Sequence, residues 1–340
     1  MTRKTTTPRG SRRATRGKER SNGNPVSRET YDVLVLATMS AGKSSFINAL
    51  VGRELLPSAN EATTACLTSI EHRRSASAFR GACYTHDGVM LATQERASVE
   101  QVRAWNADAQ VGQICLYGKF SKGSPATAPK LVLHDTPGPN NSQDERHAEM
   151  MLGAVRTIPF KVVCYVLNAG QLGTWDDRRL LEQLHGLLAR QPGRRIVFIL
   201  NKVDLLDPER GEDIAGHVGK ARAYLEGLGF TAPIIVPTMA STALVARKAM
   251  DAQALTRVER ARLRQSLDDL AAGAPCPLDA AALPDALRVR MLKDLNRINK
   301  STRAASAGTQ AGAVAELEQL VIHSGIRTVE FLLNQRSLVA

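Results

Sequence analysis

The feature that most constrains the fold is a series of short apolar runs that alternate with helical patterns. The first run, 31–37, is almost continuously apolar, which is typical of a strand buried on both faces of a parallel sheet. Similar runs follow at 130–134, 161–167, 195–200 and 233–236. Helical patterns lie at 46–50, 143–155, 176–190 and 212–228. This alternation predicts an α/β fold, a doubly wound and mostly parallel sheet with helices on both faces.

Two regions depart from this alternation. Within 66–119 we expect strands at 66–73, 78–84 and 112–117, a turn at 86–88 and a helix over 98–108. They predict an antiparallel extension inserted into the sheet. After 242 the chain becomes helical and charged, with a Pro/Ala stretch at 273–287, a helix near 288–299, a small-residue linker at 303–313 and an apolar helical segment to 340. That last segment is broken at Ser324 and Gly325.

The first thirty residues differ from the rest in charge. They hold nine arginines and lysines against two glutamates, which gives +7 of the net charge of +12. A basic segment with almost no aliphatic residues cannot form a core, so we expect a disordered tail over 1–30. Such a tail is either a solvated end or an arm for an anionic membrane surface or nucleic acid. We therefore expect three parts: this tail, an α/β core over 31–248, and a helical extension over 249–340 that packs on the core.

The apolar runs and the cysteines indicate the cellular compartment of the protein. We find no apolar run that approaches the ~18 residues of a membrane helix, and the N-terminal thirty residues contain no signal-peptide core. The five cysteines are scattered, with no CxxC pair, which argues against a disulfide scaffold or a zinc ribbon. We expect a cytoplasmic protein.

The segment 37–45, Ala-Thr-Met-Ser-Ala-Gly-Lys-Ser-Ser, follows the first strand and opens a helix. That context is what a phosphate-binding loop requires, because backbone amides and the positive helix end then face phosphate oxygens. Lys43 can reach the β- and γ-phosphates, and the Ser44 hydroxyl can hold Mg²⁺. The first glycine of the P-loop motif is Ala37 here, which is acceptable if φ stays negative. The predicted nucleotide contacts in this loop are Ser40, Ala41, Gly42, Lys43, Ser44 and Ser45.

Two further segments complete the predicted phosphate and metal site. Asp135 directly follows the strand at 130–134, and an acid at this position can hold the water shell of a metal ion. Gly138 leaves its amide free to meet a γ-phosphate. Between the P-loop helix and the next strand, Thr64 can complete Mg²⁺ coordination when a γ-phosphate is present. Thr63 and Thr68 are rivals for that role. The predicted metal ligands are Ser44, Thr64 and Asp135.

A further segment, Asn201-Lys202-Val203-Asp204, predicts which nucleotide base is bound. It follows the strand at 195–200. A carboxylate at Asp204 can accept two hydrogen bonds from guanine, at N1–H and the 2-amino group, and adenine lacks that pattern. Met239 and Ala240 follow the last strand, and their backbone could touch the base. The three main segments in this order indicate a guanine-nucleotide-binding protein.

These residues also resemble a known family. The segments 37–52, 56–65 and 135–140, and Ser324-Gly325 near the end, are similar to the GTPase domain of bacterial dynamin-like proteins, over about 31–335. The resemblance implies a P-loop GTPase that hydrolyses GTP to GDP and phosphate with Mg²⁺ when two such domains pair transiently as a homodimer. In this reading Ser40, Lys43, Thr64 and Gly138 are catalytic, and Ser40 helps to hold a monovalent cation, K⁺ or Na⁺.

The sequence departs from the family pattern in the P-loop, at the base-contacting pair and in the helical stalk. Met39 stands where eukaryotic dynamins often have glutamine, and the base-contacting pair is Met239-Ala240 rather than Ser-Ala. No long helical stalk is recognisable, so we expect a separate stalk-bearing partner protein. The alternative function is an RNA- or ribosome-associated GTPase switch that uses the basic tail as its RNA contact.

Overall fold

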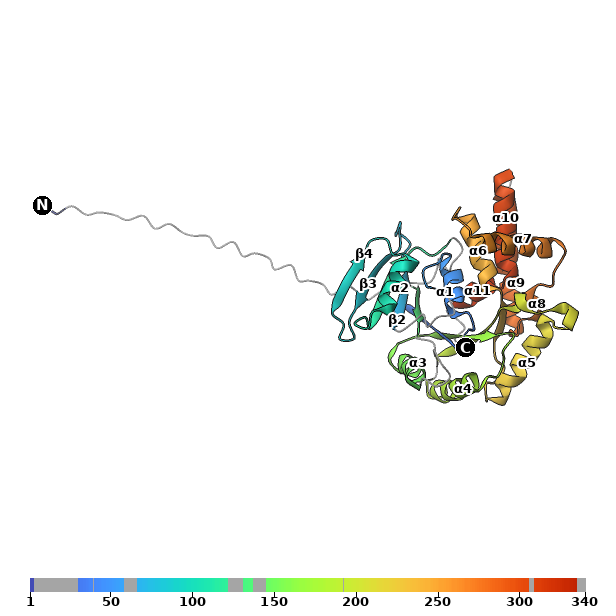
Figure 1. Cartoon of the computed structure of the whole chain (residues 1–340), viewed down its shortest axis with the longest axis horizontal. Helices are drawn as coiled ribbons and strands as arrows, with labels where there is room; N and C mark the ends of the chain where they lie inside the picture. The colour runs from blue at the N-terminus through green and yellow to red at the C-terminus, as the bar shows by residue number, and fades with distance from the viewer. Residues whose placement is uncertain are drawn as a thin grey trace.

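The computed structural model describes residues 1–2, 30–38, 40–57, 66–121, 131–136, 145–191, 193–305 and 309–334. These residues form one large sheet between layers of helices, with further helices at the C-terminal end (Figure 1). The predicted tail over 1–30 lies almost entirely outside the described residues. No helix in the described ranges combines the length and the apolarity needed to cross a bilayer.

The sheet of the described residues has nine strands in the order β4-β3-β5-β2-β6-β1-β7-β8-β9. Their bounds are β1 Tyr31–Ala37, β2 Leu67–His72, β3 Arg80–Tyr84, β4 Met90–Gln94, β5 Gln113–Gly118, β6 Leu131–Asp135, β7 Val162–Asn168, β8 Arg195–Asn201 and β9 Ile235–Thr238. From β6 to β9 all neighbouring pairs are parallel. The carboxyl ends of these five strands therefore meet at one side of the sheet, which we call the carboxyl edge.

The inserted region extends this sheet on the β6 side. β2 is antiparallel to β6, and β3 is antiparallel to both β4 and β5, as expected for an antiparallel extension. One pair differs, because β2 and β5 run parallel with the helix α2, Val99–Ala107, between β4 and β5. β4 was not predicted from the sequence. All five of its residues are exposed, so it lacks the alternation of buried and exposed side chains that marks a strand.

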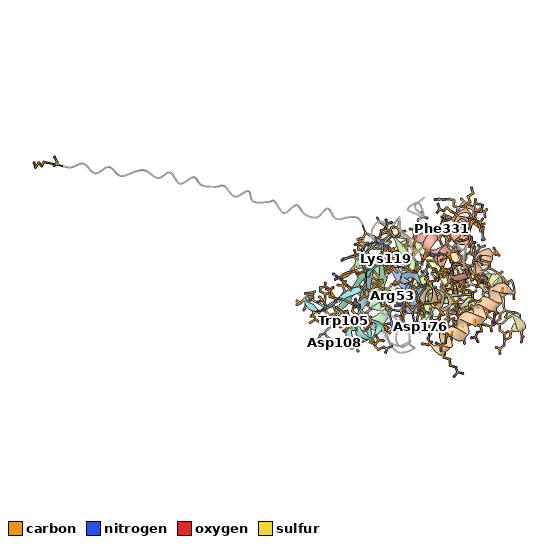
Figure 2. All side chains as sticks on the ribbon, turned by 90° about the horizontal axis from the view of Figure 1, so that it is seen from above. Arg53, Trp105, Asp108, Lys119, Asp176 and Phe331 are labelled. Atoms are coloured by element: carbon orange, nitrogen blue, oxygen red, sulfur yellow. The ribbon has the colours of Figure 1, made fainter. Side chains whose placement is uncertain are left out.

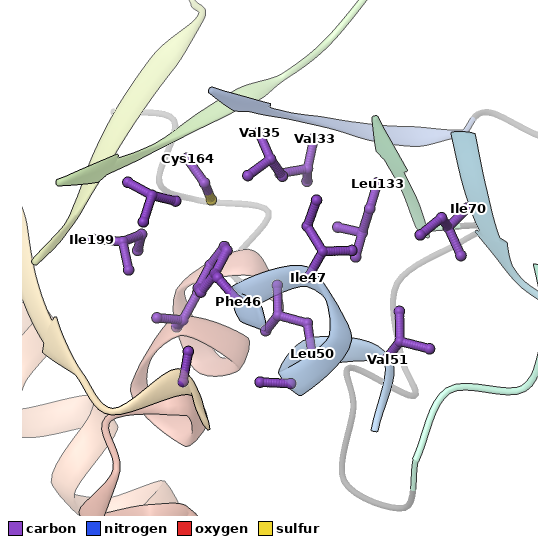
Figure 3. Packing of buried hydrophobic residues seen from close by; sticks show 14 of the residues in the cluster. Val33, Val35, Phe46, Ile47, Leu50, Val51, Ile70, Leu133, Cys164 and Ile199 are labelled. Carbon is purple, nitrogen blue, oxygen red and sulfur yellow. The ribbon is translucent and has the colours of Figure 1, made fainter. Parts of the chain in front are cut away.

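Helices cover both faces of the sheet. Val33 and Val35 of β1 face one core with α1, Lys43–Val51, and Figure 3 shows Phe46, Ile47 and Leu50 packed beneath the strands. The alternate residues Leu34 and Leu36 face a second core. That core is made with α3 Glu145–Thr157, α4 Trp175–Leu188 and α5 Ile214–Gly227. Burial on both faces explains why these strands read as continuous apolar runs.

Most of the C-terminal helices pack on the α1 side of the sheet. The C-terminal helices are α6 Ala240–Met250, α7 Arg257–Ala271, α8 Pro277–Ala280, α9 Asp285–Ala305, α10 Thr309–His323 and α11 Ile326–Asn334. One of them, α8, also contacts α5 beside β9. Apolar residues of α11 belong to the same core as α1, whereas Leu320 and Val321 of α10 pack with Ala246 of α6. Figure 2 shows Phe331 of α11 apart from Trp105 of α2 and Asp108, which belong to the inserted region.

One expectation for an individual segment was wrong. The linker predicted at 303–313 is largely helical, because α9 continues to Ala305 and α10 begins at Thr309. Alanine, which is abundant there, favours helix as well as being small. Trp175, the first residue of α4, has 66% of its surface exposed. The break predicted at Ser324 and Gly325 is confirmed and separates α10 from α11.

Candidate functional site

The P-loop joins β1 to α1 at the carboxyl edge. Gly42 precedes α1 with φ +87°, a left-handed conformation that glycine adopts without strain. A Cβ at Gly42 would lie 2.5 Å from the side-chain nitrogen of Asn201, so the loop also requires glycine for close packing. The backbone of Ser40 is left-handed, with φ +61°. Ala37 is not among the described residues that have a positive φ. The methyl group of Ala37 is therefore compatible with the loop, as expected.

The start of α1 leaves its amides available. Gly42 caps the helix without a side-chain hydrogen bond, although the carbonyl oxygen of Gly42 accepts from Phe46 at 2.9 Å. The first-turn amides of an α-helix have no partner within the helix and carry partial positive charge. Ser44 and Ser45, both half-buried, lie in this first turn. The local geometry is that of an anion-binding helix start.

Lys43 meets the predicted metal-binding acid directly. Its ammonium donates to a carboxylate oxygen of Asp135 and, at 2.6 Å, to the carbonyl oxygen of Thr136. Lys43 and Asp135 are both buried, and Asp135 is almost completely so. The Thr136 hydroxyl donates to the carbonyl oxygen of Val35 at 3.1 Å, which fixes the end of β6 against β1. The structure therefore brings the P-loop lysine and the strand-end acid together from positions 92 residues apart.

This pair also tests whether the residues suit Mg²⁺. Mg²⁺ in nucleotide sites is held by one or two protein oxygens, with water and phosphate as the other ligands. The Asp135 carboxylate already accommodates a cationic group in Lys43, and the Ser44 hydroxyl is on the next residue of α1. An anionic oxygen and a hydroxyl are hard donors of the type that Mg²⁺ prefers. The Asp135 carboxylate and the Ser44 hydroxyl therefore suit Mg²⁺ as ligands.

Asn201 connects three segments of the edge. Its side-chain nitrogen donates to the carbonyl oxygen of Ala41 at 3.0 Å. Its side-chain oxygen accepts from the Thr238 hydroxyl at 3.2 Å and from the backbone amide of Ala240 at 3.1 Å. Asn201 therefore ties the P-loop to the ends of β8 and β9. The sequence predicted a nucleotide contact here, and the structure gives the side chain a positioning role between the predicted phosphate and base loops.

The rest of the base segment turns away from β8. Lys202 is left-handed at φ +67° and is followed by a short 3₁₀ turn, Val203–Leu205. Its side chain lies close to Gly42, since a Cβ on that glycine would be 3.6 Å from the lysine Cε. Asp204 is exposed. Surrounding protein atoms partly desolvate its carboxyl and raise its pKa, while its own backbone amide, Arg262 of α7 and Lys202 oppose that rise.

The backbone of Met239 and Ala240 is already engaged. The amide of Met239 donates to the carbonyl oxygen of Ser324 at 2.9 Å, and that of Ala240 donates to Asn201. The carbonyl oxygen of Met239 accepts from Ala243 within α6. Contact with a base at this position would thus use the Met239 side chain or the following amides of α6.

Some predicted residues cannot be placed. Met39, Thr63, Thr64 and Gly138 lie outside the described residues. The rival Thr68 is fully buried in β2, paired in register with Asp135, so it belongs to a regular strand rather than to a switch loop.

The structure also adds residues that the sequence analysis missed. Asn168, at the end of β7, donates to the carbonyl oxygen of Ser40 at 3.5 Å, and its side-chain oxygen accepts from the Gly170 amide at 3.1 Å. A polar residue directly after the apolar run 161–167 was the available signal for it. Ser324 had no such signal as a site residue, because its contact with Met239 depends on packing between elements far apart in the chain.

The fold and this edge define a P-loop GTPase domain of α/β type. A family model described as the dynamin family matches residues 33–203, about half of the chain. The chain belongs to the dynamin family.

The chain is similar to one curated relative and to two solved structures. It is 26% identical over 212 residues to a bacterial dynamin-like protein of Nostoc punctiforme (strain ATCC 29133 / PCC 73102), covering 56% of this chain and 28% of the relative. It thus spans little more than a quarter of that relative. Two chains of an oligomerised bacterial dynamin pair, described as providing a mechanism for long-range sensing and tethering of membranes, match with 16% identity and TM-scores of 0.47 and 0.45. Each match covers 86% of this chain and 45% of the solved chain.

Proposed function

We propose that this protein hydrolyses GTP to GDP and phosphate at the carboxyl edge. The observation that carries the proposal is the buried pair of Lys43 and Asp135 at the start of α1. In this pair, a cation that can meet phosphate and an acid that can hold the water shell of a metal ion lie beside a helix start with available amides. Membership of the dynamin family favours this function over the RNA-associated switch.

Nucleotide binding would exchange the partners of this pair. The β- and γ-phosphates compete with Asp135 for the ammonium of Lys43, which frees the carboxylate for the water shell of a metal ion. Ser44 and Asp135, with Thr64, would hold Mg²⁺, which neutralises charge that develops on the phosphates. The amides of α1 and of Gly138 would hold phosphate oxygens in place during attack by water.

The base would be selected by Asp204. Its carboxylate would accept from guanine N1–H and the 2-amino group, and the Lys202 side chain lies close to Gly42 of the P-loop. Asn201 fixes the distance between this loop and the P-loop through its bond to Ala41. Phosphate binding and base reading would therefore occur on one connected frame.

We propose that hydrolysis is activated when two copies pair across the carboxyl edge. Trp175 and Leu205 support this, because both are about two-thirds exposed and follow the adjacent strands β7 and β8. Exposed large apolar side chains are typical anchors of protein interfaces. Ser40, whose backbone is left-handed and bonded to Asn168, would help to hold the K⁺ or Na⁺ ion at the phosphates.

We propose roles for the parts of the chain from their composition and their position in the sequence. We propose that 31–248 is the catalytic core and 249–340 an extension that packs on it. The basic tail would bring a cytoplasmic protein to an anionic membrane surface or to nucleic acid, and a separate stalk-bearing protein would complete a membrane assembly.

The test is GTP turnover at increasing protein concentration, with Lys43→Ala as the inactive control. Activation by pairing predicts a rate per molecule that rises with concentration, and dimers that form only with GDP and aluminium fluoride. The rate should be higher in K⁺ than in Cs⁺. A constant rate per molecule would exclude activation by pairing, and equal rates in both salts would exclude the cation role of Ser40. Vesicles of anionic lipid and RNA, each added at two salt concentrations, separate the two candidate partners of the tail.

A further inference from the structure

We propose that the turn between α10 and α11, residues Ser324 and Gly325, is a positioning element of the base-reading loop. The turn holds Met239 and the start of α6 in place, and through them sets discrimination at C6 of the purine ring. This inference rests on the proposed function, since it concerns how the same site recognises guanine. It makes the C-terminal helices part of the nucleotide site.

The base loop at Met239 and Ala240 is held by hydrogen bonds to two other parts of the chain. On one side Ala240 donates to the side chain of Asn201 at 3.1 Å. On the other side Met239 donates to the carbonyl oxygen of Ser324 at 2.9 Å. Two consecutive amides are thus fixed by two different parts of the chain. Without the bond to Ser324, Asn201 would hold the loop from one side only.

The turn is pressed directly against β9. Gly325 has φ +79°, and a Cβ on it would lie 2.2 Å from the carbonyl oxygen of Pro237. Contact at that distance is impossible, so any side chain at Gly325 must push the turn away from β9. Ser324 is fully buried, and its hydroxyl donates to the carbonyl oxygen of Val321 at 2.7 Å. The amide of Ile326 bonds to the same hydroxyl at 3.4 Å, which ties the turn to α11.

A buried ionic cluster fixes the helices on both sides of the turn. The cluster consists of Arg247 of α6, Glu318 of α10, and Arg327 and Glu330 of α11. Arg327 donates to both oxygens of Glu318 at 2.7 Å and to Glu330 at 2.7 Å. Glu330 in turn accepts from Arg247 at 2.5 Å.

The same cluster reaches the P-loop helix. Arg247 donates to the backbone carbonyl oxygens of Ala49 and Leu50, at the end of α1. Buried side chains with complementary charges hold one arrangement, because each displaced partner would be left unpaired. α6 is therefore fixed near both ends, by the turn at Met239 and by the cluster at Arg247.

This arrangement has a consequence for base recognition. The start of α6 carries partial positive charge, which favours a carbonyl oxygen over an amino group at the adjacent ring position. Such discrimination needs a fixed distance, and the bond from Met239 to Ser324 supplies it. Asp204 reads the other side of the ring from a separate loop. Displacing the turn should thus weaken recognition at C6 while recognition at C2 remains.

The experiment measures affinities for GDP, IDP, ADP and tripolyphosphate in the full chain and in Gly325→Ala. GDP and IDP differ only at C2, which faces Asp204, whereas IDP and ADP differ at C6, beside the start of α6, and at N1, which also faces Asp204. We expect the preference for IDP over ADP to fall at least ~10-fold, the equivalent of one hydrogen bond. The preference for GDP over IDP and the affinity for tripolyphosphate should stay within about 2-fold, because Asp204 and the P-loop keep their own supports.

The matched control is Gly273→Ala. Gly273 has nearly the same φ, +80°, but a Cβ there would meet nothing within 4 Å. This variant carries the same backbone strain without the clash, so its base preferences should equal those of the natural protein. An equal loss in both glycine variants would overturn the inference, because strain alone would then explain it.

A milder variant covers the case in which Gly325→Ala fails to fold. Ser324→Ala removes the hydroxyl bonds that shape the turn and leaves β9 untouched. It should lower the IDP-to-ADP preference several-fold, with Ser301→Ala as its control, since Ser301 bonds to Ile298 on an exposed part of α9. An unchanged preference in the folded variant overturns the inference. Failure of the natural protein to prefer GDP over ADP would instead refute the proposed function.

Discussion

Asn201 and Ala41, 160 residues apart, are joined by a hydrogen bond of 3.0 Å from the side-chain nitrogen of Asn201 to the carbonyl oxygen of Ala41. The same side chain accepts from Thr238 and Ala240, so one buried amide connects the loops proposed to bind phosphate and base. Replacing Asn201 therefore disturbs both loops together.

We expect Asn201→Ala to destabilise the protein by about 3 kcal/mol, since three hydrogen bonds are lost and buried polar groups are left unpaired. Affinity for tripolyphosphate should fall as well, although Asn201 is not assigned to the phosphates. Urea denaturation and calorimetric titration measure the two effects. Asn296→Ala, on the exposed face of α9, is the control and should change neither. Retained tripolyphosphate affinity would show that the bond to Ala41 does not organise the P-loop.

Lys43→Ala should abolish tight GTP binding and leave the fold intact. Lys43 is the cation that the structure places at the start of α1, and GTP brings up to four negative charges to it. The variant also removes the buried ammonium that donates to Asp135, so we expect a loss of stability of about 3 kcal/mol at neutral pH. Titration with a non-hydrolysable GTP analogue and circular dichroism check both points. Unchanged affinity would remove the P-loop assignment.

Sequence patterns predicted much of this architecture because both faces of the central strands are buried. The parallel strands β1, β6, β7, β8 and β9 and their helices agree with the expectations to within a few residues. β4 could not be predicted, since exposure of all its side chains removes the periodic signal. The parallel pairing of β2 with β5 depends on the path of the chain around α2, which no local pattern encodes.

The candidate site was predictable where chemistry requires particular residues after strands. Lys43, Asp135 and Asn201 lie at the carboxyl edge for that reason. The contact of Lys43 with Asp135 and that of Asn201 with Ala41 were not predictable, because they depend on the order of strands in space. The link between Ser324 and Met239 is still less local, since it requires α10 and α11 to fold back onto β9.

Glu330→Gln tests the buried ionic cluster. Glu330 accepts from both Arg247 and Arg327, so the variant leaves two buried guanidinium groups with one carboxylate. We expect a loss of about 3–5 kcal/mol in the free energy of unfolding, the usual result of breaking a buried ion pair. The control is Glu182→Gln, whose partner Arg178 is exposed, and it should cost under ~1 kcal/mol. Similar losses in both variants would show that burial adds nothing to the cluster.

Trp175→Ala tests pairing at the carboxyl edge. If Trp175 anchors a second copy, its removal should lower the apparent dimer affinity by at least ~10-fold. That affinity is obtained from the dependence of GTP turnover on protein concentration. GDP binding to the monomer should not change, because Trp175 is not among the predicted nucleotide contacts. Val258→Ala, equally exposed but on α7, is the matched control. Unaltered pairing in Trp175→Ala would move the interface elsewhere.

Asp204→Asn should convert the base preference from guanine to xanthine. The carboxylate is a pure acceptor and matches the two donors of guanine at N1 and the 2-amino group, whereas xanthine has a carbonyl in place of that amino group. An asparagine side chain offers one acceptor and one donor, which fits xanthine and leaves a donor facing a donor in guanine. Each mispaired polar group costs roughly 1–3 kcal/mol, so the relative affinity should reverse by at least ~100-fold.

Competition between GTP and XTP in both proteins measures this reversal, after circular dichroism has shown that the variant is folded. Asp207→Asn is a suitable control, because Asp207 lies on the same surface loop and pairs with Arg210 rather than facing the predicted base. Its nucleotide preference should remain that of the natural protein. If Asp204→Asn keeps the natural ratio of GTP to XTP, the segment from Asn201 to Asp204 does not read the base. The carboxyl edge would then be a phosphate site whose nucleotide is selected by other residues.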